Sequence, residues 1–389
     1  MASKLTLSCQ TAYPLYCGSD ALDMLCPCIQ DFACKKRLST PPKLAIVCDT
    51  NTAQIVHHLV VPLLAKEGFV FKILCVKPGE ASKSLEYYEY LCSELRSFHF
   101  KRSDLVIAIG GGVVGDLAGF VASSYMRGVS WINIPTSLLA MVDASIGGKV
   151  ALNLCGSKNM LGAFWNPCAT LIDIRCLATL PNQEFYQACA EIIKHGFLGD
   201  ASLLTRLNTC PLTPSLVDTH PEYLCSIILR SLKLKALYVE QDPKEGYRRA
   251  LLNFGHSLGH AIESKAHGTM PHGDCVALGM LIIIRSLVAL SSREDLLCRF
   301  PLKNKSSLGS ALYYQSMLDT LKKLLLLHKL PTNCPFDVQD FFDELIFDKK
   351  AQGDTIGVIL LGKDSRAFLE RMSMQDFRTF VELGWGTHG

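Results

Sequence analysis

The sequence predicts two domains, an N-terminal α/β domain built on a mostly parallel sheet and a mainly α-helical C-terminal domain. The chain has 389 residues, which is enough for two separate hydrophobic cores. In its first half, short β-branched runs alternate with helical patterns, as in parallel sheets with crossover helices. After about Leu180 helical periodicity dominates, so we place the boundary at Thr179–Pro181 and expect domains at 1–180 and 181–389.

Four apolar runs in the first half predict strands, because each is short and ends at turn or polar residues. The predicted strands are Lys43–Cys48, Phe69–Val76, Leu105–Ile109 and Trp131–Ile134.

In the second half, four segments have apolar residues at the spacing of an amphipathic helix. They are Tyr186–Phe197, Tyr223–Val239, Gly255–Ser264 and Asp274–Leu290. Only Thr355–Leu361 has the composition of a strand, and Arg299–Ser310, rich in Lys, Ser and Gly, predicts a surface loop.

The composition is that of a globular protein, with 49% apolar and 19% charged residues. A net charge of +3 argues against nucleic acid as a principal partner, because phosphate-backbone binding requires a concentrated basic face. The 17 cysteines lie scattered in apolar stretches, which favours reduced core thiols. No signal peptide is evident, and the most apolar stretch, Cys275–Leu290, is interrupted by Arg285. We therefore expect a cytoplasmic protein with no membrane partner.

Polar or glycine-rich segments directly follow each of the four predicted strands. Parallel strands end at the same edge of a sheet, where ligands of such folds bind. The sequence therefore predicts one binding crevice formed by Asp49–Asn51, Glu80–Lys83, Gly110–Asp116 and Thr136–Ser137.

Within this crevice, Gly110–Gly115 satisfies the pattern G-x-G-x-x-G between a strand and a helix. Glycines there let backbone N–H groups approach a pyrophosphate at the helix N-terminus. The acid that usually follows about twenty positions later to hold a ribose is missing. The motif thus predicts a nucleotide site of non-standard topology, with a purely structural glycine turn as the alternative.

A second polar run, Asp143–Lys149 and Ser157–Asn159, places Lys149 and Lys158 near glycines. A lone exposed lysine is by default only solvated. The adjacent Asp143 and Asn159 favour a site for an anionic ligand instead.

Four of the eleven histidines are crowded into seventeen residues, at His256, His260, His267 and His272. Imidazole is the commonest biological ligand of zinc-like ions, so the crowding predicts a metal site. His256 and His260 share a helical face at i, i+4, and His272 lies in a predicted loop before the next helix. His267 is set aside because nothing patterned surrounds it.

A catalytic metal takes about three protein ligands, so a further donor is expected. The best candidate is Glu191, which stands in an apolar helical run and shares a face with Lys194 at i, i+3.

Assembled in order, these blocks closely resemble the 3-dehydroquinate synthase family. The resemblance is continuous from about Ile107 to Met280 and includes Asp49–Asn51 and Pro78–Lys83. Its most specific stretches are Gly110–Phe120, Met141–Lys149, Ser157–Phe164 and Leu251–Glu263.

The resemblance implies an α/β nucleotide-binding domain, a helical metal-binding domain and an active site between them. The implied enzyme of the shikimate pathway converts 3-deoxy-D-arabino-heptulosonate 7-phosphate to 3-dehydroquinate and phosphate. It uses NAD as a cofactor and one divalent metal, usually zinc, with cobalt as the alternative. Transient oxidation by NAD permits phosphate elimination, and reduction, ring opening and an aldol closure follow.

By motif position, the resemblance also implies residue roles. The implied metal ligands are Glu191, His256 and His272. The implied NAD residues are Asp49, Asn51, Glu80, Lys83, Gly111, Gly112, Val113, Asp116, Thr136, Ser137, Lys149, Lys158 and Thr179. The implied substrate and catalytic residues are Asp143, Lys149, Asn159, Lys194, Lys235, Arg249, Asn253, His260 and Lys349. Arg127 is implied to reach the neighbouring subunit's site, which implies a homodimer.

The chain departs from the family at Asp274, where Glu is more frequent, and at His195, where Tyr is common. The region 285–340 matches poorly. Three alternative readings stay open: another sugar-phosphate cyclase making an inosose or valiolone, a metal-dependent polyol dehydrogenase, and a non-catalytic nucleotide- and zinc-binding protein.

Overall fold

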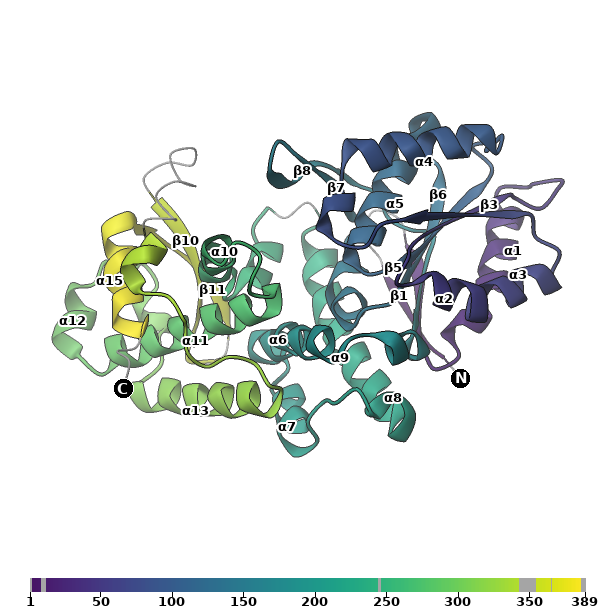
Figure 1. Cartoon of the computed structure of the whole chain (residues 1–389). Helices are drawn as coiled ribbons and strands as arrows, with labels where there is room; N and C mark the ends of the chain where they lie inside the picture. Colours follow the sequence, from purple (N-terminus) through teal and green to yellow (C-terminus); the bar gives the residue numbers. More distant parts are fainter. Residues whose placement is uncertain (1, 8–11, 244–245, 343–354, 365, 386–389) are drawn as a thin grey trace. The chain divides into compact units, whose positions relative to one another are not determined.

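Figure 1 shows the fold in a computed structural model that describes residues 2–7, 12–243, 246–342, 355–364 and 366–385. The chain forms two compact units. Unit 1 comprises residues 1–185 and 214–244, and unit 2 comprises residues 186–213 and 245–389.

Unit 1 is built on a seven-stranded sheet with the order β1-β2-β9-β6-β5-β3-β4. All neighbouring strands from β2 to β4 in this order run parallel, and only the edge strand β1 is antiparallel to its neighbour. The strands are β1 (Ser3–Leu7), β2 (Tyr13–Gly18), β3 (Leu44–Asp49), β4 (Phe71–Val76), β5 (Leu105–Gly110), β6 (Ser130–Pro135) and β9 (Ala169–Asp173). The mostly parallel α/β sheet of the N-terminal part is thus confirmed.

Both faces of this sheet are covered, which explains the continuous apolar runs of its central strands. In β3 and β5 every residue is buried. On one face, α4 (Leu85–Ser97) and α5 (Gly112–Ser124) pack with the strands around Val47, Ala108 and Leu117, and Figure 1 shows α2 (Ala53–Ile55) and α3 (Val61–Lys66) on the other side.

A two-stranded hairpin, β7 (Lys149–Leu154) and β8 (Ser157–Phe164), packs against α5. This hairpin occupies the polar run in which no strand was predicted. The missing signal has a physical cause: β8 is mostly exposed, so its sequence lacks the apolar alternation of a half-buried strand.

Unit 1 also takes in a segment beyond the predicted boundary at residue 180. Helix α9 (Pro221–Gln241) packs against β2 and against the short π-helix η5 (Ala140–Ala144), both in unit 1. The helix returns because its buried face, including Leu224, Ile228 and Leu232, covers part of the sheet unit. A single cut in the sequence therefore does not describe the units.

Unit 2 is mainly helical, as predicted for the C-terminal part. Its elements are α6 (Asn182–Gly199), which begins in unit 1, α7 (Ala201–Thr209), η7 (Arg249–Asn253), α10 (His256–Lys265), α11 (His272–Ser291), α12 (Glu294–Arg299), η8 (Lys305–Ser307), α13 (Ala311–Leu327), β10 (Thr355–Leu361), β11 (Ala367–Ser373) and α15 (Met374–Trp385). The predicted strand Thr355–Leu361 is confirmed, but a second strand, β11, pairs with it. The predicted surface loop Arg299–Ser310 contains η8 and buries Phe300, Leu302 and Leu308.

The long helix α11 is the center of unit 2 and packs against α10, α13 and α15. Of the described helices it is the one long and apolar enough to cross a membrane, and 78% of that stretch is buried inside the protein. Such burial is typical of a core helix.

The cysteines in the described ranges carry free thiols. Cys48, Cys176 and Cys189 are buried, whereas Cys75 and Cys155 are exposed. The prediction of core thiols therefore holds for only part of the set.

Candidate nucleotide and metal sites

The four polar segments predicted to form a crevice in unit 1 lie at one edge of the sheet. They follow β3, β4, β5 and β6, which are neighbours and run parallel. A pocket at this edge is lined by Gly110–Gly112, Asp116, Ser145 and Lys149. It opens at the N-terminus of α5, where free backbone N–H groups favour an anion.

Lys83 connects three parts of this edge. Its ammonium group lies 2.7 Å from Asp116 Oδ2 and 3.4 Å from Glu80 Oε1, and it donates a hydrogen bond to Asn159 Oδ1 on the hairpin. The Lys83 side chain is 4% exposed. Burial raises the pKa of Asp116, although the neighbouring Lys83 opposes the rise. The contacts make Lys83 a buried cation that holds the hairpin to the sheet edge.

Other predicted cofactor residues have local roles at the strand ends. The Asp49 carboxylate accepts hydrogen bonds from the backbone N–H (2.8 Å) and the hydroxyl (2.9 Å) of Thr52. The backbone N–H of Thr136 donates to the carbonyl of Gly110 at 2.9 Å, and Ser137 Oγ accepts from Ala140.

The remaining predicted residues of unit 1 divide into exposed and buried groups. Asn51, Lys158 and Thr179 are exposed, and the pocket lining does not include them. Lys235 is 5% exposed and forms an ion pair with Asp143 at 2.5 Å. Asp143 and Lys235, 92 residues apart in sequence, are thus brought together by the return of α9.

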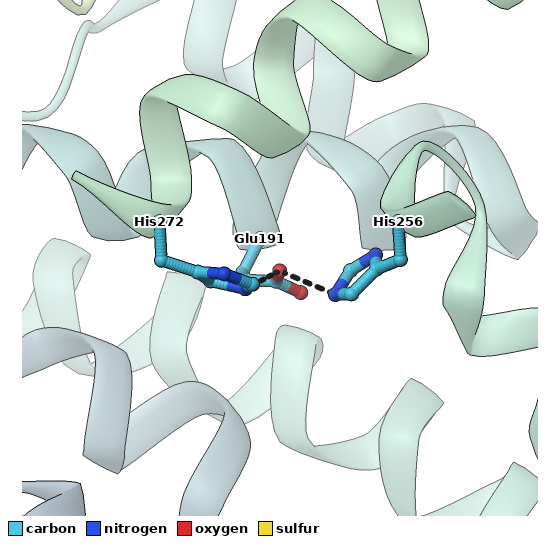
Figure 2. A group of neighbouring side chains, drawn as sticks. All are labelled: Glu191, His256 and His272. Carbon is cyan, nitrogen blue, oxygen red and sulfur yellow. Dashed lines mark ion pairs between the residues drawn. The ribbon is translucent and has the colours of Figure 1, made fainter. Parts of the chain in front are cut away.

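Unit 2 brings Glu191, His256 and His272 together from three helices, as Figure 2 shows. One ligand atom of each lies within 4.8 Å of the other two. His256 Nε2 lies 3.3 Å and His272 Nε2 lies 3.9 Å from Glu191 Oε1. One carboxylate oxygen and two imidazole nitrogens that converge in this way form a donor set suited to a zinc-like ion.

Both imidazoles are held by their other ring nitrogen. His256 Nδ1 lies 3.2 Å from the Phe254 carbonyl oxygen, and His272 Nδ1 lies 2.8 Å from Glu263 Oε2. With Nδ1–H as the donor, both Nε2 atoms are left as acceptors that face Glu191. This is the tautomer a metal ligand needs.

The buried Glu191 carboxylate lies beside a cation that favours its ionised form. Burial alone would raise the pKa of Glu191, but the charge of the neighbouring Lys194 holds it well below the usual range. Lys194, itself 2% exposed, forms an ion pair with Glu191, so the predicted acid and lysine do share a helical face. His195, at the position where the family often has Tyr, is fully buried.

Glycines set the spacing of these helices. A Cβ atom at Gly279 would lie 2.0 Å from the Gly255 carbonyl oxygen, and one at Gly259 would lie 3.1 Å from that of Cys275. Helices α10 and α11 therefore approach closely enough for His256 and His272 ring centroids to lie 5.4 Å apart. The glycines that the sequence places among the histidines are explained by this close packing.

His272 is the first residue of α11 and not, as predicted, part of a loop. Pro271 and Gly273 give this segment a loop-like composition. Pro271 precedes the helix as its N-cap in an extended conformation, and Gly273 lies in the first turn, whose N–H groups make no bonds within the helix.

The other predicted residues of unit 2 lie as follows. The His260 ring is 5.4 Å from His256 and 5.7 Å from His272, whereas His267 is exposed at a positive φ of 47°. Arg249 is buried and Asn253 exposed at the two ends of η7. Lys349 lies outside the described residues.

In unit 1, Arg127 is exposed in a turn where both it and Met126 have positive φ.

Among solved structures, enzymes of the sugar-phosphate cyclase class have a fold similar to this one. The structure is similar to that of 2-deoxy-scyllo-inosose synthase complexed with carbaglucose-6-phosphate, NAD+ and Co2+. The TM-score is 0.77 at 22% identity, over 98% of this chain and 100% of the other. It is also similar to 2-epi-5-epi-valiolone synthase from Streptomyces hygroscopicus with NAD+ and Zn2+ bound, with a TM-score of 0.73 at 25% identity over 90% and 92% of the chains. An iron-containing alcohol dehydrogenase shares the fold at a TM-score of 0.64 and 12% identity, over the full length of both chains.

The sequence comparisons are more specific. Residues 73–187 match the N-terminal and residues 188–300 the C-terminal domain of 3-dehydroquinate synthase. The 3-dehydroquinate synthase of Clostridium kluyveri is 34% identical over 340 residues, covering 87% of this chain and 88% of the relative. That of Desulforamulus reducens is 38% identical over 342 residues, with the same coverage. The chain belongs to the 3-dehydroquinate synthase family.

Proposed function

We propose that the protein converts 3-deoxy-D-arabino-heptulosonate 7-phosphate to 3-dehydroquinate and phosphate, as a 3-dehydroquinate synthase of aromatic amino-acid biosynthesis. The observation that carries this proposal is the convergence of Glu191, His256 and His272 in a chain of this family. Relatives named 3-dehydroquinate synthase are 34–38% identical over most of the chain, whereas the two cyclases of other substrates reach 22–25%. This difference favours the heptulosonate phosphate.

The proposal assigns NAD to unit 1 and a divalent metal to unit 2. Bound NAD accepts and returns a hydride, and the metal, zinc or cobalt, polarises substrate hydroxyl oxygens as a Lewis acid. The side chains and backbone of the protein would bind NAD and the metal. The N-terminus of α5 and Lys83 supply positive charge for the pyrophosphate, and Glu191, His256 and His272 supply the metal's donors. Asp49, Asn51, Glu80, Asp116, Thr136, Ser137, Lys158 and Thr179 complete the proposed NAD set.

The proposed substrate residues divide by charge. Lys149, Lys194, Lys235 and Arg249 are cations that match the substrate's carboxylate and phosphate. Asp143, Asn159, Asn253 and His260 can exchange hydrogen bonds or protons with its hydroxyl groups. Lys349 is proposed from the family motif alone. The ion pair of buried Lys235 with the partly exposed Asp143 supports this division, because it holds the ammonium group in a fixed position.

We also propose a cytoplasmic homodimer in which Arg127 acts on the partner subunit's site. The exposed, positive-φ turn at Met126 and Arg127 supports this, because strained exposed turns cluster at functional contacts. Light scattering coupled to size exclusion tests the dimer. Mixing Arg127→Ala subunits with Lys194→Ala subunits tests the exchange: mixed dimers regain part of the activity only if Arg127 serves the neighbouring site.

The test of the activity is phosphate release from the heptulosonate phosphate. We expect it to require NAD, to stop when a chelator is added and to leave no net NADH. Sedoheptulose 7-phosphate and glucose 6-phosphate serve as comparators. Release from only one of these would identify a different cyclase, and NADH accumulation with glycerol-like substrates would identify a dehydrogenase.

A further inference from the structure

We propose that Glu263 is a positioning residue of the metal site, which orients His272 and fixes its tautomer. This inference rests on the proposed metal ligands and adds a residue to which neither the motif pattern nor the ligand set gave a role. Glu263 lies on α10, in the last stretch of the family motif Leu251–Glu263, nine residues before the histidine that it contacts.

The contact is direct and well formed. Glu263 Oε2 lies 2.8 Å from His272 Nδ1, which is the distance of a charge-assisted hydrogen bond. The Glu263 side chain is 18% and the His272 side chain 31% exposed, so the pair is partly shielded from water. The opposite ring nitrogen, Nε2, faces Glu191. The carboxylate therefore acts on the ring from the side remote from the metal donors.

The two histidines of the site are held by different partners. His256 Nδ1 faces the backbone carbonyl of Phe254, which no side-chain substitution removes. His272 depends on a side chain. A carboxylate on the remote nitrogen also raises the basicity of the ligating nitrogen. Together with Glu191 it supplies two negative charges near a divalent cation, partly offset by Lys194.

The packing of α10 against α11 also explains why the carboxylate that orients His272 is on α10. His272 is the first residue of α11, where χ1 rotation is not restricted by a preceding helical turn. Glu263, two turns along α10 from His256, reaches this ring across the close packing of α10 and α11. The hydrogen bond from His272 to Glu263 therefore restrains the orientation of the His272 ring, which the first turn of α11 leaves free to rotate.

The test is the affinity of apo-protein for Zn2+, measured by competition with a chromophoric chelator, with the visible absorption of bound Co2+ as a second readout. We expect Glu263→Ala to weaken Zn2+ binding about 10–100-fold and to change the Co2+ spectrum. Glu263→Gln, which keeps an acceptor oxygen without the charge, should recover part of the affinity. The apo-protein of each variant should unfold at the same denaturant concentration as the wild type. Glu382→Ala, which removes the exposed i, i+4 ion pair with Arg378, is the matched control and should bind Zn2+ normally.

The outcomes separate the two proposals. If wild-type protein binds Zn2+ and His256→Ala does not, but Glu263→Ala binds as tightly as wild type, the positioning role is wrong and the metal site stands. If Glu263→Ala weakens binding only in proportion to a loss of folding stability, the role is structural and the inference is again wrong. If wild type binds no Zn2+ or Co2+, the proposed metal site fails and this inference fails with it.

Discussion

Gly273 and Gln187 are in contact through their backbones: a Cβ atom at position 273 would lie 2.0 Å from the Gln187 carbonyl oxygen. Gly273 follows His272 at the start of α11, and Gln187 lies one helical turn before Glu191 on α6. The contact therefore sets the separation of α6 and α11 beside two of the three proposed ligands. Because glycine has no side chain, the backbones of the two helices are in direct contact here, and this contact determines their separation.

Adding one methyl group should disturb this contact. We expect Gly273→Ala to lower the free energy of unfolding by about 1–3 kcal/mol, as overpacking does, and to weaken Zn2+ binding. Urea denaturation and Zn2+ competition measure the two effects. Gly268→Ala is the control: it carries the cost of a positive φ of 81° but meets nothing within 4 Å. Weakened Zn2+ binding in both variants would show that helix spacing is not the cause.

The four histidines should differ in their effect on metal content. We expect His256→Ala and His272→Ala to lose the metal and turnover together. His260→Ala should keep the metal and lose turnover, and His267→Ala, exposed and outside the cluster, should keep both. Metal analysis of the purified variants decides the assignment. Full metal content in His256→Ala would refute the ligand set.

Replacing Lys83 should lower the stability of the protein more than the loss of an exposed charge would. Lys83→Met leaves the Asp116 carboxylate without its partner, so the pKa of Asp116, already raised by burial, should rise further. We expect a loss of about 1.5–3 kcal/mol in the free energy of unfolding, with weaker NAD binding. Lys72→Met removes the more exposed ion pair with Glu94 and should cost less than about 1 kcal/mol. Equal losses in the two variants would contradict the role of burial.

His328 should make unit 2 sensitive to acid. Its Nε2 accepts the Leu212 N–H at 3.1 Å and its Nδ1 donates to the Leu324 carbonyl at 2.7 Å, so the ring is neutral in the folded protein. Burial lowers the pKa of His328, against the smaller effect of the Leu324 carbonyl. The unfolded chain therefore binds a proton more readily, and stability is full above about pH 6.5 and falls as the pH drops below it.

The check is urea denaturation at a series of pH values. His328→Gln should have a smaller loss of unfolding free energy between pH 7.5 and pH 5.5 (both values approximate) than the wild type. His267→Gln, at an exposed position, should follow the wild-type curve. If His328→Gln and the wild type have the same pH dependence, buried His328 is not its source.

The predictable parts of the fold are those in which burial acts on a continuous segment. Strands β3, β5 and β6 are buried on both faces, and their apolar runs predicted them within two residues. The strand predicted from Phe69 begins only at Phe71, because Val70 is 59% exposed before β4. Strand β1 and hairpin strand β8 were not predicted, and most of their residues face solvent. Strands β2, β7 and β9 were also missed, although every residue of β9 is buried, so burial alone did not make a strand predictable.

The candidate sites also contain parts that could be predicted from the sequence and parts that could not. Glu191, His256 and His272 could be named because imidazole and carboxylate groups in such a pattern have few structural uses. The contacts of Lys83 with Asp116 and Asn159, and of His272 with Glu263, could not be predicted. They join separate elements whose mutual orientation is a result of packing, and a single sequence carries no signal for it.

The return of α9 to unit 1 has a consequence for any attempt to divide the protein. The chain passes between the two units three times, after Phe185, after Thr213 and after Lys244. No single cut separates the two units from each other: a fragment that ends at Phe185 lacks the helix that covers β2, and its complement carries that helix without a sheet to bury it. The two halves are thus obliged to fold as one polypeptide, and truncation at the family-domain border near residue 187 should give insoluble fragments.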